Sequence, residues 1–195
     1  DQVGLLQKYI GSEGVAPRLH RMGTADWARA RAKAQKSVED IADHLLEIYS
    51  ARKLAKGHAF TPDDAGQREF EEAFPYEETA DQLRAVAEIK RDMESEKPMD
   101  RLLCGDVGFG KTEVAVRAAF KAAMDGFQVA VLVPTTVLAQ QHYQTFAARF
   151  ADFAPKVDVV CRFRSLREQA ATLRDVARGR VDILIGTHAI LNRRR

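Results

Sequence analysis

The sequence is poor in cysteine and lacks any long apolar segment. It holds only two cysteines, Cys104 and Cys161, which lie far apart and each at the end of an apolar run. The absence of a Cys-x-x-Cys pair argues against a zinc or dithiol redox site. We therefore expect two buried free thiols, as in a reducing cytoplasm. No apolar run approaches the length of a membrane span and no signal peptide is visible, so a membrane partner is not expected.

A strong excess of one charge is also lacking. Lysine and arginine number 30 against 28 aspartates and glutamates, a net charge of +2, and this total does not by itself indicate a nucleic-acid-binding protein. The stretch from Arg162 to Arg195 is nevertheless locally basic. A solvated helix face with a tail and a DNA-facing surface both fit this pattern. Hydrophobic residues make up 46% and charged residues 30%, which is typical of a globular domain with an apolar core.

The length of 195 residues suffices for one domain and an appendage. Because the chain begins at Asp1 and ends in three arginines, we expect it to be a fragment of a longer protein. Residues 1–23, with a possible strand from Val3 to Ile10, resemble the end of a domain that lies upstream. Residues 24–57 are predicted to form a long helix, and residues 58–195 part of an α/β domain.

The long helix is predicted from apolar residues at steps of three and four between Asp26 and Lys56. Thr24 or Asp26 can cap its start, and Gly57 can end it. About thirty residues rising about 1.5 Å each give roughly 45 Å, which favours a strut between domains. The polar and acidic residues 57–78 are interpreted as a linker.

An alternating pattern of strands and helices follows. Thr79 and Gln82 form a predicted capping box at the start of a helix that runs to Glu94. From Arg101 onward, apolar runs alternate with helical stretches, which predicts a parallel sheet covered by helices on both faces. The predicted strands are 101–104, 128–133, 157–161 and 181–185, and the predicted helices between them are 111–124, 137–150 and 165–178.

A complete phosphate-binding loop occupies residues 105–112, Gly-Asp-Val-Gly-Phe-Gly-Lys-Thr, which match G-x-x-x-x-G-K-[ST]. Its glycines allow the backbone to wrap around phosphate oxygens, and the amides at the following helix start attract anions. Lys111 would meet the β and γ phosphates, and the Thr112 hydroxyl would bind Mg²⁺. The loop therefore predicts ATP binding.

Hydrolysis requires carboxylates that hold the metal and orient water, and these are not evident. No Asp-Glu pair follows an apolar run: Asp182 precedes its predicted strand, and Asp125 closes a helix. We expect the chain to bind ATP and barely to hydrolyse it.

The carboxyl ends of parallel strands share one edge of a sheet, where ligands collect. Besides the phosphate loop, residues 134–136, 162–165 and 186–188 fall at such ends, and their hydroxyl, amide and guanidinium groups suit a phosphate backbone. Each also has a structural reading. Thr135 or Thr136 can cap the next helix, Ser165 and Glu168 form a second capping box, and residues 186–188 can be an ordinary turn.

Three of these segments resemble helicase motifs. Residues 105–113, 134–142 and 182–188 are similar to motifs I, Ia and Ic of superfamily-two helicases, and most similar to those of bacterial transcription-repair coupling factors. Residues 74–82 resemble the adenine-recognition segment of that family. Residues 5–11 resemble the end of its RNA-polymerase-interaction domain, and the stretches around Trp27 and 48–52 its interdomain helix. The resemblance covers nearly the whole chain.

The resemblance implies a RecA-like P-loop lobe with ATP and Mg²⁺ as cofactors. Phe74 would pack on adenine and Gln82 would bond its edge, a role that competes with the capping box. Cys161 stands where the family usually has serine. The implied catalytic residues are Lys111 and Thr112, the latter also the metal ligand. The implied nucleotide contacts are Phe74, Gln82, Gly105, Asp106, Val107, Gly108, Phe109, Gly110, Lys111, Thr112 and Glu113. The implied DNA contacts are Pro134, Thr135, Thr136, Arg162, Phe163, Thr187 and His188.

The family couples ATP to translocation on double-stranded DNA, displaces stalled RNA polymerase and recruits excision-repair proteins. The chain would hold only the first motor lobe. Two alternatives stay open. One is the motor lobe of a branched-DNA helicase of the RecG type, and the other is a scaffold whose long helix transmits strain. Lys111→Ala separates motor from scaffold, because only the motor requires nucleotide.

Overall fold

The computed structural model describes residues 22–191, and the chain divides into two compact units, residues 1–54 and 55–195. The strand considered for Val3 to Ile10 and the resemblance of residues 5–11 lie outside the described residues. No helix within residues 22–191 is long and apolar enough to cross a membrane.

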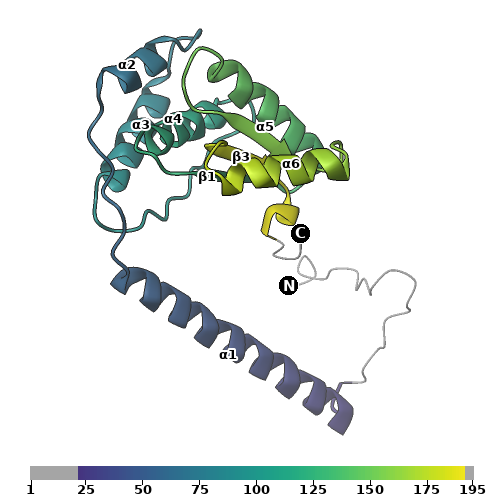
Figure 1. Cartoon of the computed structure of the whole chain (residues 1–195). Helices are drawn as coiled ribbons and strands as arrows, with labels where there is room; N and C mark the ends of the chain where they lie inside the picture. The colour runs from purple at the N-terminus through teal and green to yellow at the C-terminus, as the bar shows by residue number, and fades with distance from the viewer. Residues whose placement is uncertain (1–21, 192–195) are drawn as a thin grey trace. The chain divides into compact units, whose positions relative to one another are not determined.

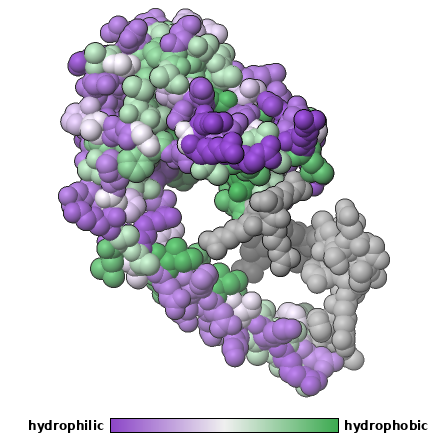
Figure 2. Space-filling model, in the orientation of Figure 1, coloured by the Kyte–Doolittle hydropathy of each residue, from purple (hydrophilic) through white to green (hydrophobic). Residues whose placement is uncertain are grey.

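The described part of the first unit is the helix α1 (Ala25–Leu54), and the predicted long helix is confirmed (Figure 1). Thr24 caps it, its hydroxyl accepting the N–H of Trp27 at 3.3 Å. None of its residues is buried, so its apolar side chains lie at the surface, interspersed with polar ones (Figure 2). Thirty residues rising about 1.5 Å each make it roughly 45 Å long.

The second unit is built on a parallel sheet of the strands β1 (Val129–Leu132), β2 (Val157–Val160) and β3 (Ile183–Gly186). Their order is β1-β3-β2, and both outer strands run parallel to β3. The helices α5 (Thr136–Arg149) and α6 (Leu166–Ala177) connect successive strands. Because every strand points the same way, their carboxyl ends lie at one edge of the sheet.

The core forms between this sheet and the helices α4 (Lys111–Met124) and α5 (Figure 1). Ile183 and Ile185 of β3 are fully buried against Phe120 of α4 and Phe146 of α5. Burying each such side chain contributes about 1.5–3 kcal/mol. The helix α3 (Ala80–Met93) packs on α4 through a second apolar cluster that includes Ile89 and Met93. The last described residues form a short 3-10 helix, His188–Leu191.

The strand predicted from Arg101 to Cys104 is wrong. These residues form no ladder, and Leu102 is 86% exposed. A β-strand requires backbone hydrogen bonds to a neighbouring strand. This segment is instead bound to α3 by the side chain of Arg101. The Arg101 guanidinium binds Glu88 and Asp92 of α3 at 2.6 Å each. The expectation of two buried thiols is half wrong for the same reason, since Cys104 is exposed whereas Cys161 is buried.

The linker interpretation of residues 57–78 is also wrong. The segment contains the helix α2 (Ala65–Glu72), and its Phe70 is fully buried, stacked on Phe120 with ring centroids 4.0 Å apart. Asp63 pairs with Lys90 and Lys121, at 2.5 and 2.9 Å. The segment looks like a linker because its charged residues find their partners far along the chain.

Candidate nucleotide site and neighbouring sheet edge

The glycine-rich loop leads directly into α4, as predicted. Gly110 is the N-cap of the helix with a φ of 69°, and Gly108 has a φ of 87°, a region that strongly favours glycine. No side chain caps this helix start. The Glu113 N–H bonds the Gly110 carbonyl at 3.0 Å, and the N–H groups of Lys111 and Thr112 are available to an anion.

The Lys111 side chain is bound to the backbone of the loop. Its ammonium donates to the carbonyl oxygens of Gly105 and Asp106, both at 2.6 Å. Among residues 22–191 it forms no ion pair with a carboxylate. Its positive charge is thus held by neutral acceptors alone, which suits a cation that must meet phosphate oxygens.

A hollow of about 890 Å³ adjoins the loop. It brings together segments that are distant in sequence: the residues before α3, the loop itself and the last turns of α5. Seven of the predicted nucleotide contacts line it, whereas Gly105, Asp106, Lys111 and Thr112 belong to the loop beside it. The seven are Phe74, Gln82, Val107, Gly108, Phe109, Gly110 and Glu113.

Gln82 has two partners. Its Oε1 accepts the N–H of Thr79 at 2.8 Å and the Thr79 hydroxyl accepts the N–H of Gln82, so the predicted capping box is confirmed. Its Nε2 donates to the Phe109 carbonyl at 3.2 Å. A Cβ added to Gly110 would lie 2.2 Å from this Nε2, and any larger residue there would displace the amide. The contact of Gln82 with adenine stays a prediction.

A network of charges borders the same hollow. The Glu113 carboxylate accepts from Arg117 at 3.0 Å and from Arg149 at 2.9 and 3.0 Å. Arg117 also donates to Glu78 at 2.8 Å. This hydrogen bond lowers the pKa of Glu78. Burial opposes the charge of Arg117, yet its bonds to Glu78 and Glu113 raise its pKa.

The two arginines were not among the predicted site residues. Arg149 lies 36 positions from Glu113 in sequence, and neither arginine belongs to a recognisable motif. The only local signal is the position of Arg149 in the last turn of α5, where a cation is ordinary. Sequence reasoning therefore had no means to find them.

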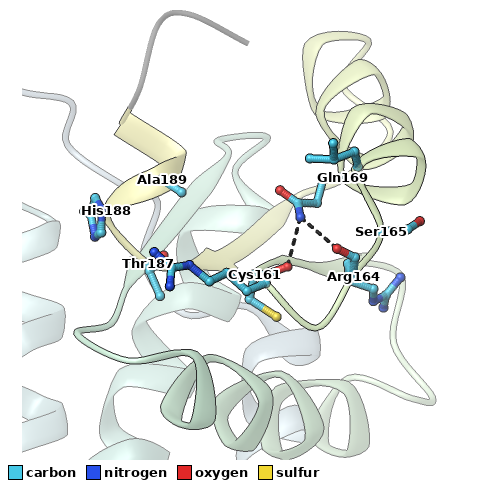
Figure 3. A pocket seen from close by; sticks show the side chains of 9 residues that line it. Cys161, Arg164, Ser165, Gln169, Thr187, His188 and Ala189 are labelled. Atoms are coloured by element: carbon cyan, nitrogen blue, oxygen red, sulfur yellow. Dashed lines mark hydrogen bonds between the residues drawn. The ribbon is translucent and has the colours of Figure 1, made fainter.

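A second hollow, of about 450 Å³, lies at the carboxyl ends of β2 and β3 (Figure 3). Three of the predicted DNA contacts line it: Arg162, Thr187 and His188. The buried Gln169 of α6 fixes the loop after β2, its Nε2 donating to the carbonyls of Cys161 and Arg164 at 3.2 and 2.8 Å (Figure 3). Arginine, hydroxyl and imidazole side chains line this recess at the sheet edge together with the apolar side chains of Leu166 and Ala189.

The remaining predicted DNA contacts lie outside this hollow. Pro134 and Thr135 follow β1, and Thr136 begins α5. Thr135 caps α5, its hydroxyl accepting the N–H of Leu138 at 3.2 Å, so its structural reading is confirmed. Phe163 is 65% exposed.

The second predicted capping box is present as well. Ser165 and Glu168 bond each other at the start of α6, and the Ser165 hydroxyl and N–H lower the pKa of Glu168. Among residues 22–191, no group of three or more His, Cys, Asp and Glu side chains is arranged to hold a metal ion.

The sheet consists of parallel strands connected by helices, and a glycine-rich loop leads into the start of α4. This combination defines a RecA-like α/β lobe of the P-loop class. Residues 79–194 match the family described as DEAD/DEAH box helicase, and the chain belongs to this family of helicase-like ATPases.

Curated relatives are transcription-repair-coupling factors. The chain is 56% identical over 193 residues to that of Bacillus subtilis (strain 168) and 51% identical to that of Staphylococcus aureus (strain USA300). Each match covers 99% of this chain and 16% of the relative, so the chain spans about a sixth of the length of these proteins. A solved structure of RecG bound to a three-way DNA junction is also similar, with 38% identity and a TM-score of 0.69 over 74% of this chain and 20% of that one.

Proposed function

We propose that the chain is the ATP-binding motor lobe of a double-stranded DNA translocase that displaces stalled RNA polymerase and couples transcription to nucleotide excision repair. The observation that carries this proposal is the glycine-rich loop at the start of α4, set beside a hollow lined by Phe74 and Gln82 of the segment that resembles an adenine-recognition segment. The high identity to transcription-repair-coupling factors supports the finer assignment.

The residues present fit a nucleotide triphosphate. The uncapped amides of α4 and the Lys111 ammonium would hold its phosphates, while Phe74 offers a flat ring for the base on the other side of the hollow. The Thr112 hydroxyl would bind Mg²⁺ together with phosphate oxygens, since Mg²⁺ in such sites takes few protein ligands. Bound Mg²⁺ would neutralise charge on the phosphates.

Hydrolysis of ATP requires carboxylates beside the glycine-rich loop in addition to the loop itself. Asp125 accepts from Thr61, and Asp182 precedes β3 and accepts the N–H of Lys156, so neither faces the glycine-rich loop from a strand end. We propose that the chain by itself binds ATP and hydrolyses it very slowly.

The edge of the sheet would carry DNA. Arg162, Thr187 and His188 line the recess, and arginine and hydroxyl groups of this kind contact phosphates without reading bases. RNA polymerase and excision-repair proteins would be partners of a protein of the relatives' full length. Residues 1–23 would be the end of a polymerase-interaction domain, residues 24–57 its interdomain helix and residues 58–195 the motor lobe.

A binding measurement on the 195-residue chain tests the first step. Lys111→Ala should lose Mg-ATP binding by more than tenfold while the melting temperature stays unchanged, because Lys111 contacts only carbonyls of its own loop. Lys97→Ala, at an exposed lysine outside the loop, is the matched control. Failure of the unaltered chain to bind ATP would refute the proposal, and equal binding by the variant would remove Lys111 from the site.

A second experiment separates this function from that of a branched-DNA helicase. The similarity to RecG is the observation that supports this alternative. A protein of the relatives' length that contains this chain should release stalled RNA polymerase from DNA when given ATP, and Lys111→Ala should abolish the release. Unwinding of a three-way junction without release of polymerase would support the helicase instead.

A further inference from the structure

Arg149 is the meeting point of three segments that are distant in sequence. Its guanidinium donates to the Glu113 carboxylate of α4 at 2.9 and 3.0 Å, and to the Phe70 carbonyl of α2 at 2.9 Å. It also lies over the Phe70 ring, 4.4 Å from the centroid, and 5.5 Å from the centroid of Phe74. A planar guanidinium bound on two sides and stacked on a ring has little freedom to move.

Phe74 depends on such contacts for its position. It follows α2 in a segment without helix or strand, and its N–H donates to the Glu71 carbonyl at 3.1 Å, a bond that holds its backbone but not its ring. Arg117 lies over its ring at 5.3 Å and Arg149 at 5.5 Å, and the Tyr76 ring meets it edge-on at 5.5 Å. Both guanidiniums are anchored to the same carboxylate, that of Glu113.

Glu113 immediately follows the lysine and threonine of the phosphate loop. Its carboxylate belongs to a buried residue and already accepts from both arginines, so its observed role is to hold them. The first turn of α4 thus offers its backbone N–H groups to phosphates. Through the Glu113 side chain, it also holds the arginines that lie over the Phe74 ring. The Glu113 carboxylate and the two arginines, of which Arg149 makes the double contact, thus connect the two halves of the hollow.

From this geometry we infer that Arg149 is a positioning residue, which sets the orientation of Phe74 and thereby the affinity for the base of a nucleotide, independently of its phosphates. This inference rests on the proposed nucleotide site. A purely structural ion pair would instead affect folding, and binding of base and phosphates alike.

Arg149→Gln tests the inference in the 195-residue chain. The variant removes the stacked guanidinium and its double contact with Glu113. Titration calorimetry with Mg-ATP and with Mg-tripolyphosphate, which has no base, separates the two halves of the site. We expect ATP to bind about tenfold more weakly and tripolyphosphate to stay within twofold, because stacking on an aromatic side chain has about this value. Arg174→Gln, in the last turn of α6, is the matched control and should change neither affinity.

Two further variants keep the result decisive. Arg149→Lys retains the charge without the planar double contact, and it should bind ATP as weakly as Arg149→Gln if position is what matters. If Arg149→Gln fails to fold, judged by its melting curve, Glu113→Gln releases both arginines with little change in size and should give the same selective loss.

Each outcome is interpretable. Equal weakening of both ligands, or no weakening of either, would overturn the positioning role while leaving the phosphate loop in place. An unaltered chain that binds tripolyphosphate as tightly as ATP would overturn base recognition. An unaltered chain that binds neither would refute the proposed nucleotide site, and with it this inference.

Discussion

The Gln82 side chain connects the cap of α3 to the phosphate loop. Its Oε1 accepts the N–H of Thr79 at 2.8 Å, and its Nε2 donates to the carbonyl of Phe109 at 3.2 Å. One amide group thus holds a helix start and a ligand-binding loop together. Any ligand that bonds this amide must compete with both contacts.

Two substitutions at Gln82 separate these contacts. Gln82→Glu keeps an oxygen for the Thr79 N–H and loses the donor to Phe109, whereas Gln82→Ala loses both. We expect Gln82→Ala to lower the free energy of unfolding by about 1 kcal/mol and Gln82→Glu to lower it by less than half as much. Both should weaken ATP binding. Urea unfolding and calorimetric titration measure the two effects, and equal stability losses would contradict the separation.

Acid should destabilise the second unit through Asp63. Burial raises the pKa of its carboxyl, but hydrogen bonds from Lys90 and Lys121 lower it further, to below the ordinary 3.8. A carboxyl whose folded pKa is depressed stabilises the fold above its unfolded pKa, and this stabilisation is lost as the pH falls through the folded value. The free energy of unfolding should therefore decline more steeply from about pH 5 to pH 3 in the unaltered chain than in Asp63→Asn.

At pH 7, Asp63→Asn should cost about 2 kcal/mol, because two lysines lose a charged acceptor. Asp152→Asn, at an exposed position, is the control and should leave the stability and its pH profile unchanged. Parallel pH profiles of Asp63→Asn and the unaltered chain would contradict the role of Asp63.

DNA binding at the sheet edge should depend on Arg162. Arg162→Gln should weaken binding to duplex DNA of any sequence by a similar factor and reduce the slope of log K against log salt by about 1, because it removes one phosphate contact. The control is Arg178→Gln. Arg178 follows the carboxyl end of α6, which lies about 18 Å along the helix axis from its start beside the recess. Fluorescence anisotropy over a series of salt concentrations measures both, and equal slopes for the two variants would place the DNA elsewhere.

Local features of the structure could be predicted from the sequence. The helix α4 occupies the predicted residues, and both capping boxes, at Thr79 with Gln82 and at Ser165 with Glu168, are present. Each capping box depends on two residues within one helical turn of one another. The local sequence therefore contains all the residues that determine it. The parallel sheet flanked by helices could be predicted for the same reason, from the spacing of its apolar runs.

Features that depend on distant partners could not be predicted. The segment from Arg101 to Cys104 has the composition of a strand but pairs with no strand, since Arg101 binds α3 instead. Phe70 lies in a polar stretch yet is fully buried against Phe120. The anchoring of Glu113 by Arg149 likewise appears only when α4 and α5 are packed together. The assignments of individual residues to ATP and DNA stay predictions.

The unequal exposure of the two cysteines supplies a reporter without further engineering. Cys104 is exposed and immediately precedes Gly105 of the phosphate loop, whereas Cys161 is buried beneath the sheet edge. A maleimide dye should attach to the first thiol in preference to the second, because alkylation requires access to the sulfur. The emission of that dye would then follow movements of the loop in the natural sequence, with no added cysteine and none removed.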